Sequence, residues 1–298
     1  MLRSANEIST KFLQVKKLMP FPFRQFTTVG IGGDAPLAFF PRDFSTMIEI
    51  VSYCRKEQIP FFVLGRGSNV LASDAGFDGV VLCTHELDRV QVCDGWVDAY
   101  CGANIGKILS EVAKRGMGGL AFLAGIPASL GGAIYMNAGA CGTYIESVVT
   151  EVTIFDGGGL QKIDVSECNY SYKRSRFMWS NEIILGARLR LQKTGKEKAL
   201  REIRDSLRAR AQLPTGKSLG CVFMNPEQVS AGYLIERSGL KGVCCGDAKI
   251  SEEHANFIVN MGHATAEEYK KLIQMIKERV FSETGVVLRE EIRYIGEF

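Results

Sequence analysis

Apolar and polar positions in the first quarter of the chain predict a helix, then a strand, then a glycine-rich loop. The segment from Ser45 to Lys56 has apolar residues at helical spacing behind Ser45 as the expected N-terminal cap: Met47, Ile48, Val51 and Cys54. The continuous apolar run Pro60–Leu64 is typical of a buried strand. It leads directly into Gly65–Leu71. Ligands bind beyond the carboxyl ends of strands in open α/β layers, so this loop is a candidate binding site.

The spacing of apolar and polar residues predicts helices, strands and hairpins in the rest of the chain. Up to residue 191 it predicts a helix within Leu2–Lys17, strands at Val80–Cys83 and Ile183–Leu191, hairpins around Asp94–Gly95 and Asp156–Gly159, and a helix that Asn104 caps and Gly116 ends. Further on it predicts helices at Ala199–Ala211 and Gly232–Ser238, a strand at Asn256–Asn260, a helix from the Thr265–Glu268 capping box to Gly285, and a strand at Glu291–Ile295. The polar stretch Lys193–Lys198 is the expected linker.

One long stretch, residues 116–145, contains no charged side chain. It is long enough to cross a bilayer, but Pro127, Asn137 and frequent glycines argue against a transmembrane helix, and no basic cluster flanks it. We predict instead a slot lined by backbone. Glycine lets a ligand approach the main chain closely, and free N–H groups bind phosphate without a charged side chain. A buried Gly/Ala-rich helix and turn is the alternative for this stretch alone.

Composition excludes several functional classes. The 298 residues suffice for two or three domains, and the net charge of +3 is spread out, so nucleic acid is not an expected partner. Nine cysteines without a Cys-x-x-Cys pair, and only three histidines, argue against a metal site. The odd number of cysteines, and a start (Met1–Pro20) that does not resemble a signal peptide, favour a cytoplasmic location.

Two more segments rich in glycine stand upstream of the uncharged stretch. Gly65-Arg-Gly-Ser-Asn69 lacks the Gly-Lys-Ser/Thr of a Walker A loop and the complete Gly-x-Gly-x-x-Gly of a Rossmann site. Its glycines, with Ser68 and Asn69, still offer several donors to a pyrophosphate. Phe26–Ala35 has three glycines and predicts a turn.

At this point six motifs resemble the bacterial UDP-N-acetylenolpyruvoylglucosamine reductase (MurB) family. Three are similar to its flavin-binding part: Thr28–Ala35, Leu64–Leu71, and Gly125–Ala133 with Asn137–Ala140. Three are similar to its substrate-binding part: Leu219–Pro226, Leu234–Gly242 and Gly246–Asn260. The resemblance runs from about residue 20 to the C-terminus, and six motifs in the same order are highly specific.

The resemblance implies an α+β fold. It has a two-lobed FAD-binding domain of the vanillyl-alcohol-oxidase/PCMH type and a C-terminal α+β substrate-binding domain, placed here at residues 1–82, 83–195 and 196–298. The short third part is similar to the family's smaller type. The implied activity is an NADPH-consuming, FAD-dependent reduction of UDP-N-acetylglucosamine enolpyruvate to UDP-N-acetylmuramate, a step of peptidoglycan synthesis and so of cell-wall biogenesis, cell shape and division.

The resemblance also suggests binding residues. Those expected at FAD are Gly65, Gly67, Ser68, Asn69, Gly125, Ile126, Pro127, Ser129, Gly131, Gly132 and Asn137, with backbone amides meeting the pyrophosphate. Those expected at the nucleotide sugar or at NADPH phosphates are Tyr172, Lys217, Asn225, Tyr233, Lys241 and Lys249. His254 is expected to be structural, and Cys244 and Cys245 to be reduced neighbours.

Three catalytic positions follow from the same motifs. Cys221 stands where the family has a serine before Val-Phe or Phe-Phe, so it is the expected proton donor; a thiol has a pKa of about 8.5 when unperturbed. The family arginine maps to Lys173, or to Arg174 after a shift of one residue, and the sequence does not choose between them. The family glutamate maps to Glu291, with Glu290 in place of the usual proline.

Two other functions stay open. A flavin oxidase on the same fold would explain the glycine loops but not the motifs around Cys221 and Glu291. A nucleotide-sugar-binding module without catalysis would explain the altered arginine position. In each case we expect a monomer with no membrane partner.

Overall fold

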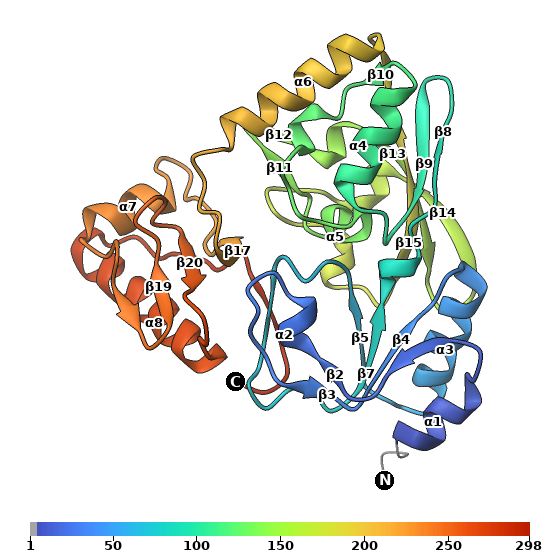
Figure 1. Ribbon diagram of the computed structural model, residues 1–298, viewed down its shortest axis with the longest axis horizontal. Helices are drawn as coiled ribbons and strands as arrows, with labels where there is room; N and C mark the ends of the chain where they lie inside the picture. The colour runs from blue at the N-terminus through green and yellow to red at the C-terminus, as the bar shows by residue number, and fades with distance from the viewer. Residues whose placement is uncertain (1–4) are drawn as a thin grey trace. The chain divides into compact units, whose positions relative to one another are not determined.

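The structure is a computed structural model that describes residues 5–298 and contains two compact units (Figure 1). The first comprises the chain up to Lys17, Ala38–Arg66 and Val81–Ala211; the second comprises Leu18–Leu37, Gly67–Val80 and Gln212–Phe298. Two N-terminal segments therefore fold with the C-terminal third, although the sequence analysis placed them in the lobe 1–82. The assignment of two lobes to FAD and a third part to the substrate stays a prediction.

The first sheet of the first unit has the strand order β1-β4-β7-β5, formed by Lys16–Leu18, Leu37–Phe40, Val80–Cys83 and Phe61–Leu64. Of the helix predicted within Leu2–Lys17, residues 2–4 lie outside the described residues, α1 spans Ala5–Lys11, and Lys16 already belongs to β1. Helix α3 spans Phe44–Lys56. Its cap is Asp43 and not Ser45, because the Asp43 carboxylate accepts the Thr46 N–H at 2.8 Å.

The second sheet of this unit has the order β14-β13-β15-β9-β8. Its strands are β8 (Val90–Val92), β9 (Trp96–Tyr100), β13 (Val149–Phe155), β14 (Leu160–Asp164) and β15 (Ile183–Arg190). Both predicted hairpins are confirmed, with Val92 opposite Val97 and Phe155 opposite Leu160. Helices α4 (Ile105–Lys114) and α5 (Leu130–Tyr135) pack against this sheet, and Asn104 caps α4 as predicted.

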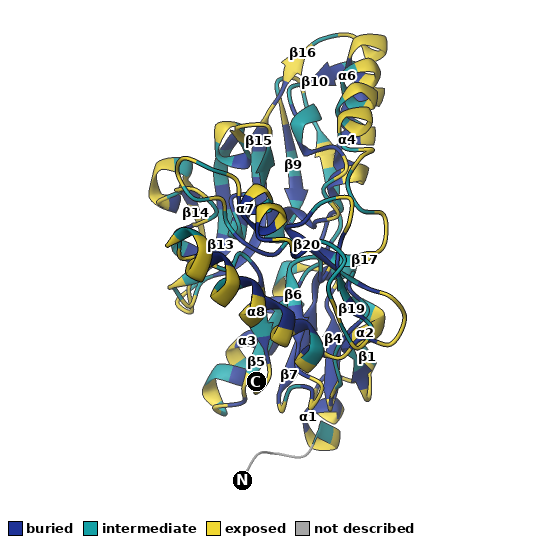
Figure 2. Cartoon of the chain, turned by 90° about the vertical axis from the view of Figure 1, so that its left-hand side faces the viewer, coloured by how far each residue is buried: buried dark blue, intermediate teal, exposed yellow. Residues whose placement is uncertain are grey.

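Helix α6 closes the first unit. It spans Lys196–Ala209, and β16 (Gln192–Lys193) before it pairs with β10 (Met117–Gly118). The linker predicted at Lys193–Lys198 is therefore wrong, since this stretch ends a strand pair and begins a helix. Ala199 is the buried residue of α6, and the outer surface of the helix is exposed (Figure 2).

The second unit is built on a four-stranded sheet with the order β17-β20-β19-β18. The strands are Lys217–Cys221, Phe257–Asn260, Ala248–Ile250 and Cys244–Cys245, and the helices are α7 (Ala231–Arg237) and α8 (Ala266–Thr284). The capping box at Thr265 and Glu268 is confirmed, and Gly285 ends α8 in the left-handed region.

The N-terminal segments of this unit share its hydrophobic core. Val29, Ile31 and Leu71 are buried in the same cluster as residues of β20, α7 and α8. Strand β6 (Val70–Ala72) pairs in parallel with β21 (Arg293–Ile295), and the short strands Phe21–Pro22 and Asp34–Ala35 flank α2 (Phe23–Phe26). The motif around Gly30 therefore folds onto the C-terminal sheet.

The remaining elements are short. They are the 3-10 turns Thr84–Glu86 (η1), Ala121–Leu123 (η2), Ile145–Ser147 (η3), Val165–Cys168 (η4) and Arg176–Met178 (η5), and the hairpin of β11 (Gly139–Ala140) and β12 (Thr143–Tyr144). Among residues 5–298, no helix combines the length and the apolar character needed to span a membrane.

Candidate active site

The loop Gly65–Asn69 exposes a run of backbone donors. None of its five N–H groups donates a hydrogen bond to any acceptor in the described part of the chain. Gly67 has φ +62°, and its carbonyl accepts the Thr28 N–H at 3.1 Å. A Cβ at Gly67 would lie 2.2 Å from the Phe26 carbonyl oxygen. Only glycine therefore fits here without distortion.

This loop suits the pyrophosphate of FAD. Consecutive backbone N–H groups without a protein acceptor, in a turn that contains glycine, form anion-binding concavities. Gly65, the first residue of the loop, lies beside the second glycine segment within the first unit, since a Cβ there would be 2.4 Å from the Ser129 hydroxyl. The residues present therefore fit the cofactor that the sequence motifs imply.

The second glycine segment holds its backbone differently. Ser129 is buried and caps α5 by accepting the Gly132 N–H at 3.3 Å. The Gly131 N–H donates to the Cys101 carbonyl at 2.7 Å, and a Cβ there would be 2.9 Å from Cys101 Cβ. We expected the amides of Gly131 and Gly132 to meet a pyrophosphate. In the structure both amides donate to protein acceptors, and the close approach of Cys101 requires glycine at position 131. Contact of these two glycines with FAD stays a prediction.

Asn137 connects α5 to the turn that carries the candidate catalytic cation. It is fully buried, its Nδ2 donates to the Ser171 carbonyl at 3.0 Å, and its Oδ1 accepts the Glu146 N–H at 3.3 Å. Ser175 adds a second link, donating to the Tyr135 carbonyl at 2.6 Å. Both ends of the Asn137 amide are used within the protein. The geometry therefore supports a positioning role rather than direct contact with a cofactor.

The turn itself presents Tyr172 and Lys173. Ser171 and Arg174 exchange backbone hydrogen bonds of 3.1 and 3.0 Å, so the two residues between them form a tight turn, with Lys173 at φ +59°. Lys173 is half-buried, whereas Arg174 is exposed and its guanidinium carbon lies 5.9 Å from the centre of the Trp179 ring. The structure gives Arg174 an aromatic partner on the surface, which favours Lys173 for the family position.

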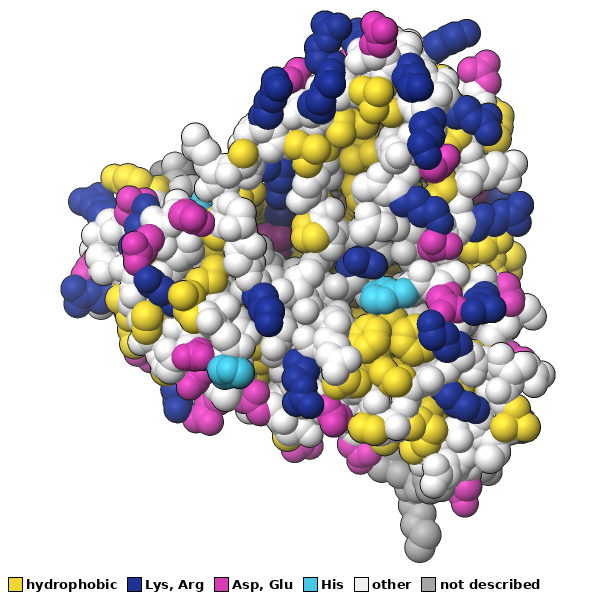
Figure 3. All heavy atoms as spheres, viewed as in Figure 1, with side chains coloured by type: hydrophobic (Ala, Val, Ile, Leu, Met, Phe, Trp, Pro, Cys, Tyr) yellow, Lys and Arg dark blue, Asp and Glu magenta, His cyan; other side chains and the backbone are white. Residues whose placement is uncertain are grey.

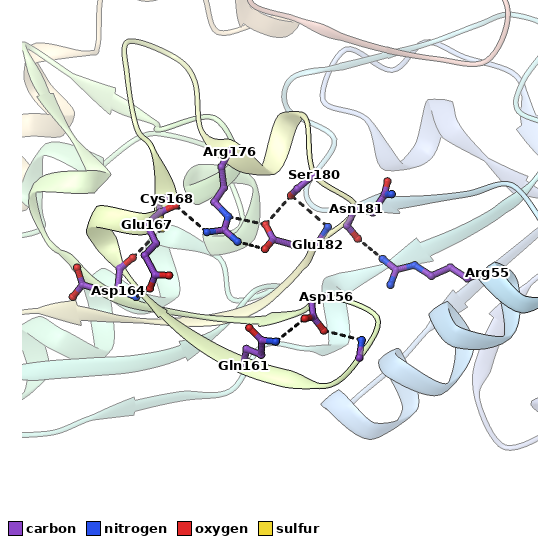
Figure 4. Close-up of polar contacts among 11 residues, drawn as sticks. Arg55, Asp156, Gln161, Asp164, Glu167, Cys168, Arg176, Ser180, Asn181 and Glu182 are labelled. Atoms are coloured by element: carbon purple, nitrogen blue, oxygen red, sulfur yellow. Dashed lines mark hydrogen bonds and ion pairs between the residues drawn. The ribbon is translucent and has the colours of Figure 1, made fainter.

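A polar network holds the chain on either side of this turn (Figure 4). Arg176 donates to both carboxylate oxygens of Glu182, with Nε 2.9 Å from Oε2, and to the Glu167 carbonyl at 3.0 Å. Ser180 donates to the same carboxylate at 2.7 Å. The hydrogen bonds from Arg176 lower the pKa of the Glu182 carboxyl. The carboxylate thus stays charged and ties η5 to the end of the loop that follows it, just before β15.

In the second unit, Cys221 ends β17 opposite Phe257. Gly220 before it has φ +78°, and the register shifts between Ser218 and Cys221. Asn256 then fixes the backbone beyond the cysteine, because its Oδ1 accepts the Phe223 N–H at 2.9 Å and its Nδ2 donates to the Phe223 carbonyl at 2.8 Å. Cys221 is left half-buried on a rigid strand end.

The segments that carry the two predicted acids meet beyond this strand end. The Glu291 N–H donates to the Val222 carbonyl at 2.8 Å, and the Met224 N–H donates to the Arg289 carbonyl at 2.9 Å. These bonds form an isolated antiparallel bridge between Phe223 and Glu290, so the backbone of Glu291 lies opposite Val222, the residue after Cys221. Cys221 and Glu291 are both half-buried.

Glu290 and Glu291 differ in their surroundings. The Glu290 carboxylate pairs with Lys277 at 2.9 Å and accepts the Tyr294 hydroxyl hydrogen bond at 2.5 Å. The Glu290 carboxylate therefore has structural partners within the second unit, which favours Glu291 as the family glutamate.

Asn69 connects the first glycine loop to Glu291. Its Nδ2 donates to the Glu291 carbonyl at 3.0 Å, and its own carbonyl accepts the Arg293 N–H at 2.9 Å. The side chain that we expected to face the cofactor therefore braces the strand that carries the candidate acid. Ser68 is half-buried in the same loop.

The predicted substrate contacts fall into two groups. Lys217 lies over Gly30, whose Cβ would be 3.1 Å from Lys217 Cδ, and Tyr233 is an exposed aromatic residue of α7. Asn225 accepts the Ala231 N–H at 3.0 Å. Lys241 and Lys249 instead pair with Glu236 and Glu252, at 2.8 and 2.5 Å. The ion pairs of Lys241 and Lys249 explain these two lysines without a substrate contact.

Two residues of the site were missed by sequence reasoning. Asn256 lies within a quoted motif, but its clamp on Phe223 could not be read from spacing. The His85 ring nitrogen lies 2.9 Å from the Gly65 carbonyl, and burial lowers the pKa of this histidine. No local signal marks His85, since its partner is a backbone carbonyl 20 residues away. Among residues 5–298, no group of acidic, histidine or cysteine residues is arranged to hold a metal ion.

Comparisons with known proteins bear on both halves of the chain. A model of the FAD binding domain family matches residues 35–163, and a model of the C-terminal domain of UDP-N-acetylenolpyruvoylglucosamine reductase matches residues 211–295. The UDP-N-acetylenolpyruvoylglucosamine reductase of Chlamydia pneumoniae is 40% identical over 285 residues, covering 93% of each chain.

Two further reductases match this chain over almost its whole length at lower identity. The reductase of Caldicellulosiruptor saccharolyticus is 36% identical and covers 99% of this chain and 96% of its own length. The crystal structure of the reductase (MurB) from Thermus caldophilus superposes with a TM-score of 0.81 at 34% identity, covering 95% of this chain and 99% of that one. The chain therefore belongs to the UDP-N-acetylenolpyruvoylglucosamine reductase family.

Proposed function

We propose that this protein reduces the enolpyruvyl ether of UDP-N-acetylglucosamine to the lactyl ether of UDP-N-acetylmuramate, with FAD as cofactor and NADPH as reductant. Similarity to reductases over almost their entire length supports this reaction. The observation that carries it for this chain is the strand pairing in which Glu291 bonds to Val222, next to Cys221.

The glycine loop Gly65–Asn69 would hold the pyrophosphate of FAD through its unpaired amides. When bound, FAD supplies the hydride that it has taken from NADPH. Gly65 and Gly67 keep the loop free of side chains that would block this approach.

Cys221 would supply the proton that completes the reaction. Addition of hydride to the β carbon leaves an enolate on the substrate, whose α carbon needs a proton. The Cys221 thiol donates it, and a thiol remains protonated at neutral pH because its ordinary pKa is about 8.5. The Asn256 clamp restricts the backbone next to the sulfur, which favours one approach direction.

Glu291 and Lys173 would stabilise charge on the substrate carboxylate. A carboxylic acid beside an enolate acts as a donor only when it is protonated. Lys173 provides a point charge, a weaker grip than the bidentate arginine of the family motif. Lys217, Asn225 and Tyr233 are the proposed contacts to the nucleotide sugar.

The test is an anaerobic spectrum of the purified protein. We expect a yellow protein whose flavin absorbance bleaches with NADPH and returns when the enolpyruvyl nucleotide sugar is added. Return of absorbance with oxygen alone, and none with the sugar, would point to an oxidase. A colourless protein that takes up no FAD would overturn the proposal.

The proposed reaction places the protein in peptidoglycan precursor synthesis, and so in cell shape and division. We also propose that it works in the cytoplasm as a monomer. Size-exclusion chromatography with light scattering tests the second point, and a mass near 32.8 kDa is expected.

A further inference from the structure

Arg210 lies against the glycine loop that precedes α5. A Cβ built on Gly125 would be 3.2 Å from both Cδ and Nε of Arg210, and 3.4 Å from Cδ2 of Leu207. Gly125 has φ +79°, a conformation that disfavours any other residue. Leu207 and Arg210 both come from the end of α6, which packs against η2 just before the loop. The end of α6 thus brings a guanidinium to this loop.

The loop has no charge of its own but has free donors. Residues 116–145 carry no charged side chain. The N–H groups of Gly125 and Ser129 donate to no acceptor within residues 5–298, whereas those of Ile126 and Ala128 bond to nearby carbonyls. Pro127 has no N–H. Two free donors beside one cation are the parts of a phosphate site.

Arg210 differs from the other basic residues of its helix. Lys and Arg side chains gather over α6 (Figure 3). Those of Lys196, Lys198, Arg201, Arg204 and Arg208 are exposed. Arg208 pairs with Asp205, with Nη1 3.7 Å from Oδ1. Arg210 is half-buried, and no carboxylate in the described part of the chain pairs with it. A cation withdrawn from water without a partner is costly, which an anionic ligand would offset.

We propose that Arg210 binds a phosphate oxygen of FAD at the Gly125–Ser129 loop. This inference rests on the proposed function, because it takes FAD as the ligand. The loop falls inside the region matched by the FAD-binding family, 35–163, but Arg210 lies in neither matched region. The guanidinium supplies the charge, and the amides of Gly125 and Ser129 supply neutral donors in the same loop.

The test compares Arg210→Gln with Arg208→Gln. Both substitutions remove one positive charge from the end of the same helix, so the loss of interaction with the helix dipole is matched. Each purified holoenzyme is diluted in steps, and free FAD is measured by its fluorescence to give a dissociation constant. We expect Arg210→Gln to weaken FAD binding by about tenfold or more, the usual effect of losing a charged hydrogen bond. Arg208→Gln should change it by less than about twofold.

Further arms separate the possible outcomes. Arg210→Lys should lose less affinity than Arg210→Gln, because it keeps the charge, and its binding should fall more steeply with salt than that of Arg210→Gln. Thermal melts of the flavin-free proteins check that each variant folds. Equal FAD affinity in both glutamine variants would overturn the inference. A raised KM for the nucleotide sugar with unchanged FAD affinity would also overturn it, and would assign Arg210 to the substrate diphosphate. If the wild-type protein itself bound no FAD, the proposed function would fail, and not only the role of Arg210.

Discussion

The loop Gly65–Asn69 and the strand end at Cys221 use the polypeptide in opposite ways. In the loop, five consecutive backbone N–H groups find no acceptor in the described residues. Just beyond the strand end, the backbone N–H groups are bonded to protein acceptors. Val222 donates to the Asn256 carbonyl, Phe223 donates to the Asn256 side chain, and Glu291 donates to Val222.

This difference indicates which atoms do the work in each place. Where the backbone N–H groups are unpaired, the main chain itself binds the ligand, and an added Cβ would block the ligand or the turn. Where the backbone is paired, it only positions side chains, and the chemistry depends on their identity. Substitutions in the loop should therefore act through shape, and substitutions at the strand end should act through functional groups.

The largest effect is expected at Cys221. Cys221→Ala removes the proposed proton donor and should lower kcat by about 10²- to 10⁴-fold, the usual share of general acid catalysis. Cys221→Ser should retain much of the activity, since a hydroxyl also donates a proton. Steady-state NADPH oxidation with the enolpyruvyl substrate measures both. Wild-type rates in the alanine variant would show that this side chain has no chemical function.

The pH profile of the same variants gives an independent check. In wild type, activity should fall at alkaline pH as the thiolate forms, and Cys221→Ser should lack this decline. Buried cysteines do not interfere: burial raises the pKa of Cys54, Cys83 and Cys101 to about 12. Cys244→Ala, at an exposed position, is the control and should keep the wild-type profile.

Gly67→Ala tests whether shape controls the loop. The new Cβ would lie 2.2 Å from the Phe26 carbonyl oxygen at a φ of +62°, so stability should fall by about 2–4 kcal/mol and FAD should dissociate readily. Urea unfolding and flavin content measure the two effects. Gly95→Ala is the matched control, since its φ is +88° but nothing lies within 4 Å of its Cβ. A loss for Gly95→Ala as large as that for Gly67→Ala would implicate φ alone.

Asn69 joins the two regions, and its substitution should lower turnover without affecting the affinity for FAD in proportion. Asn69→Asp has the same shape but cannot donate to the Glu291 carbonyl, a bond of 3.0 Å in the structure. We expect kcat to fall by about tenfold and the FAD dissociation constant to change by less than threefold. An opposite split, with FAD lost and kcat of the loaded enzyme retained, would make Asn69 a cofactor ligand only.

Local sequence patterns predicted the elements whose partners are near in sequence. The hairpins around Asp94–Gly95 and Asp156–Gly159, and the caps at Asn104 and Thr265, each depend on residues a few positions apart. The cap of α3 was misplaced because Asp43 and Ser45 are both good cap residues, and spacing does not choose between them.

The site was predicted only where a motif marks it. Cys221 and Glu291 come from such motifs. The bond from the Gly131 amide to the Cys101 carbonyl was not predicted, because it is set by tertiary packing. The bond from Asn69 to Glu291 spans 222 residues, a separation that local patterns do not report. The linker failed for the same reason, since β16 is defined by its distant partner β10.

A smaller effect is expected where side chains alone hold a loop. Arg176 lowers the pKa of Glu182, so this pair stabilises the protein above the unfolded pKa of glutamate, about 4.3, and the contribution is lost as pH falls towards the lower folded value. Glu182→Gln should therefore destabilise the protein by about 1–3 kcal/mol at pH 7 and by less at pH 4. Thermal melts at the two pH values test this. An equal loss at both would mean that packing, not charge, holds the loop.

The smallest effect is expected at Gly132. This glycine tests the comparison at a position where the backbone amide is already paired. The Gly132 N–H already donates to the Ser129 hydroxyl, the cap of α5. A Cβ at Gly132 would lie 3.3 Å from Ser129 Oγ. Alanine favours a helix interior by about 1 kcal/mol over glycine, which should roughly offset the close contact. Gly132→Ala should therefore leave stability within about 1 kcal/mol of wild type and FAD affinity within twofold. A tenfold loss of FAD with unchanged stability would mean that the ligand reaches a backbone whose donors are already paired. Unpaired amides would then no longer be the feature that separates ligand-binding backbone from supporting backbone in this protein.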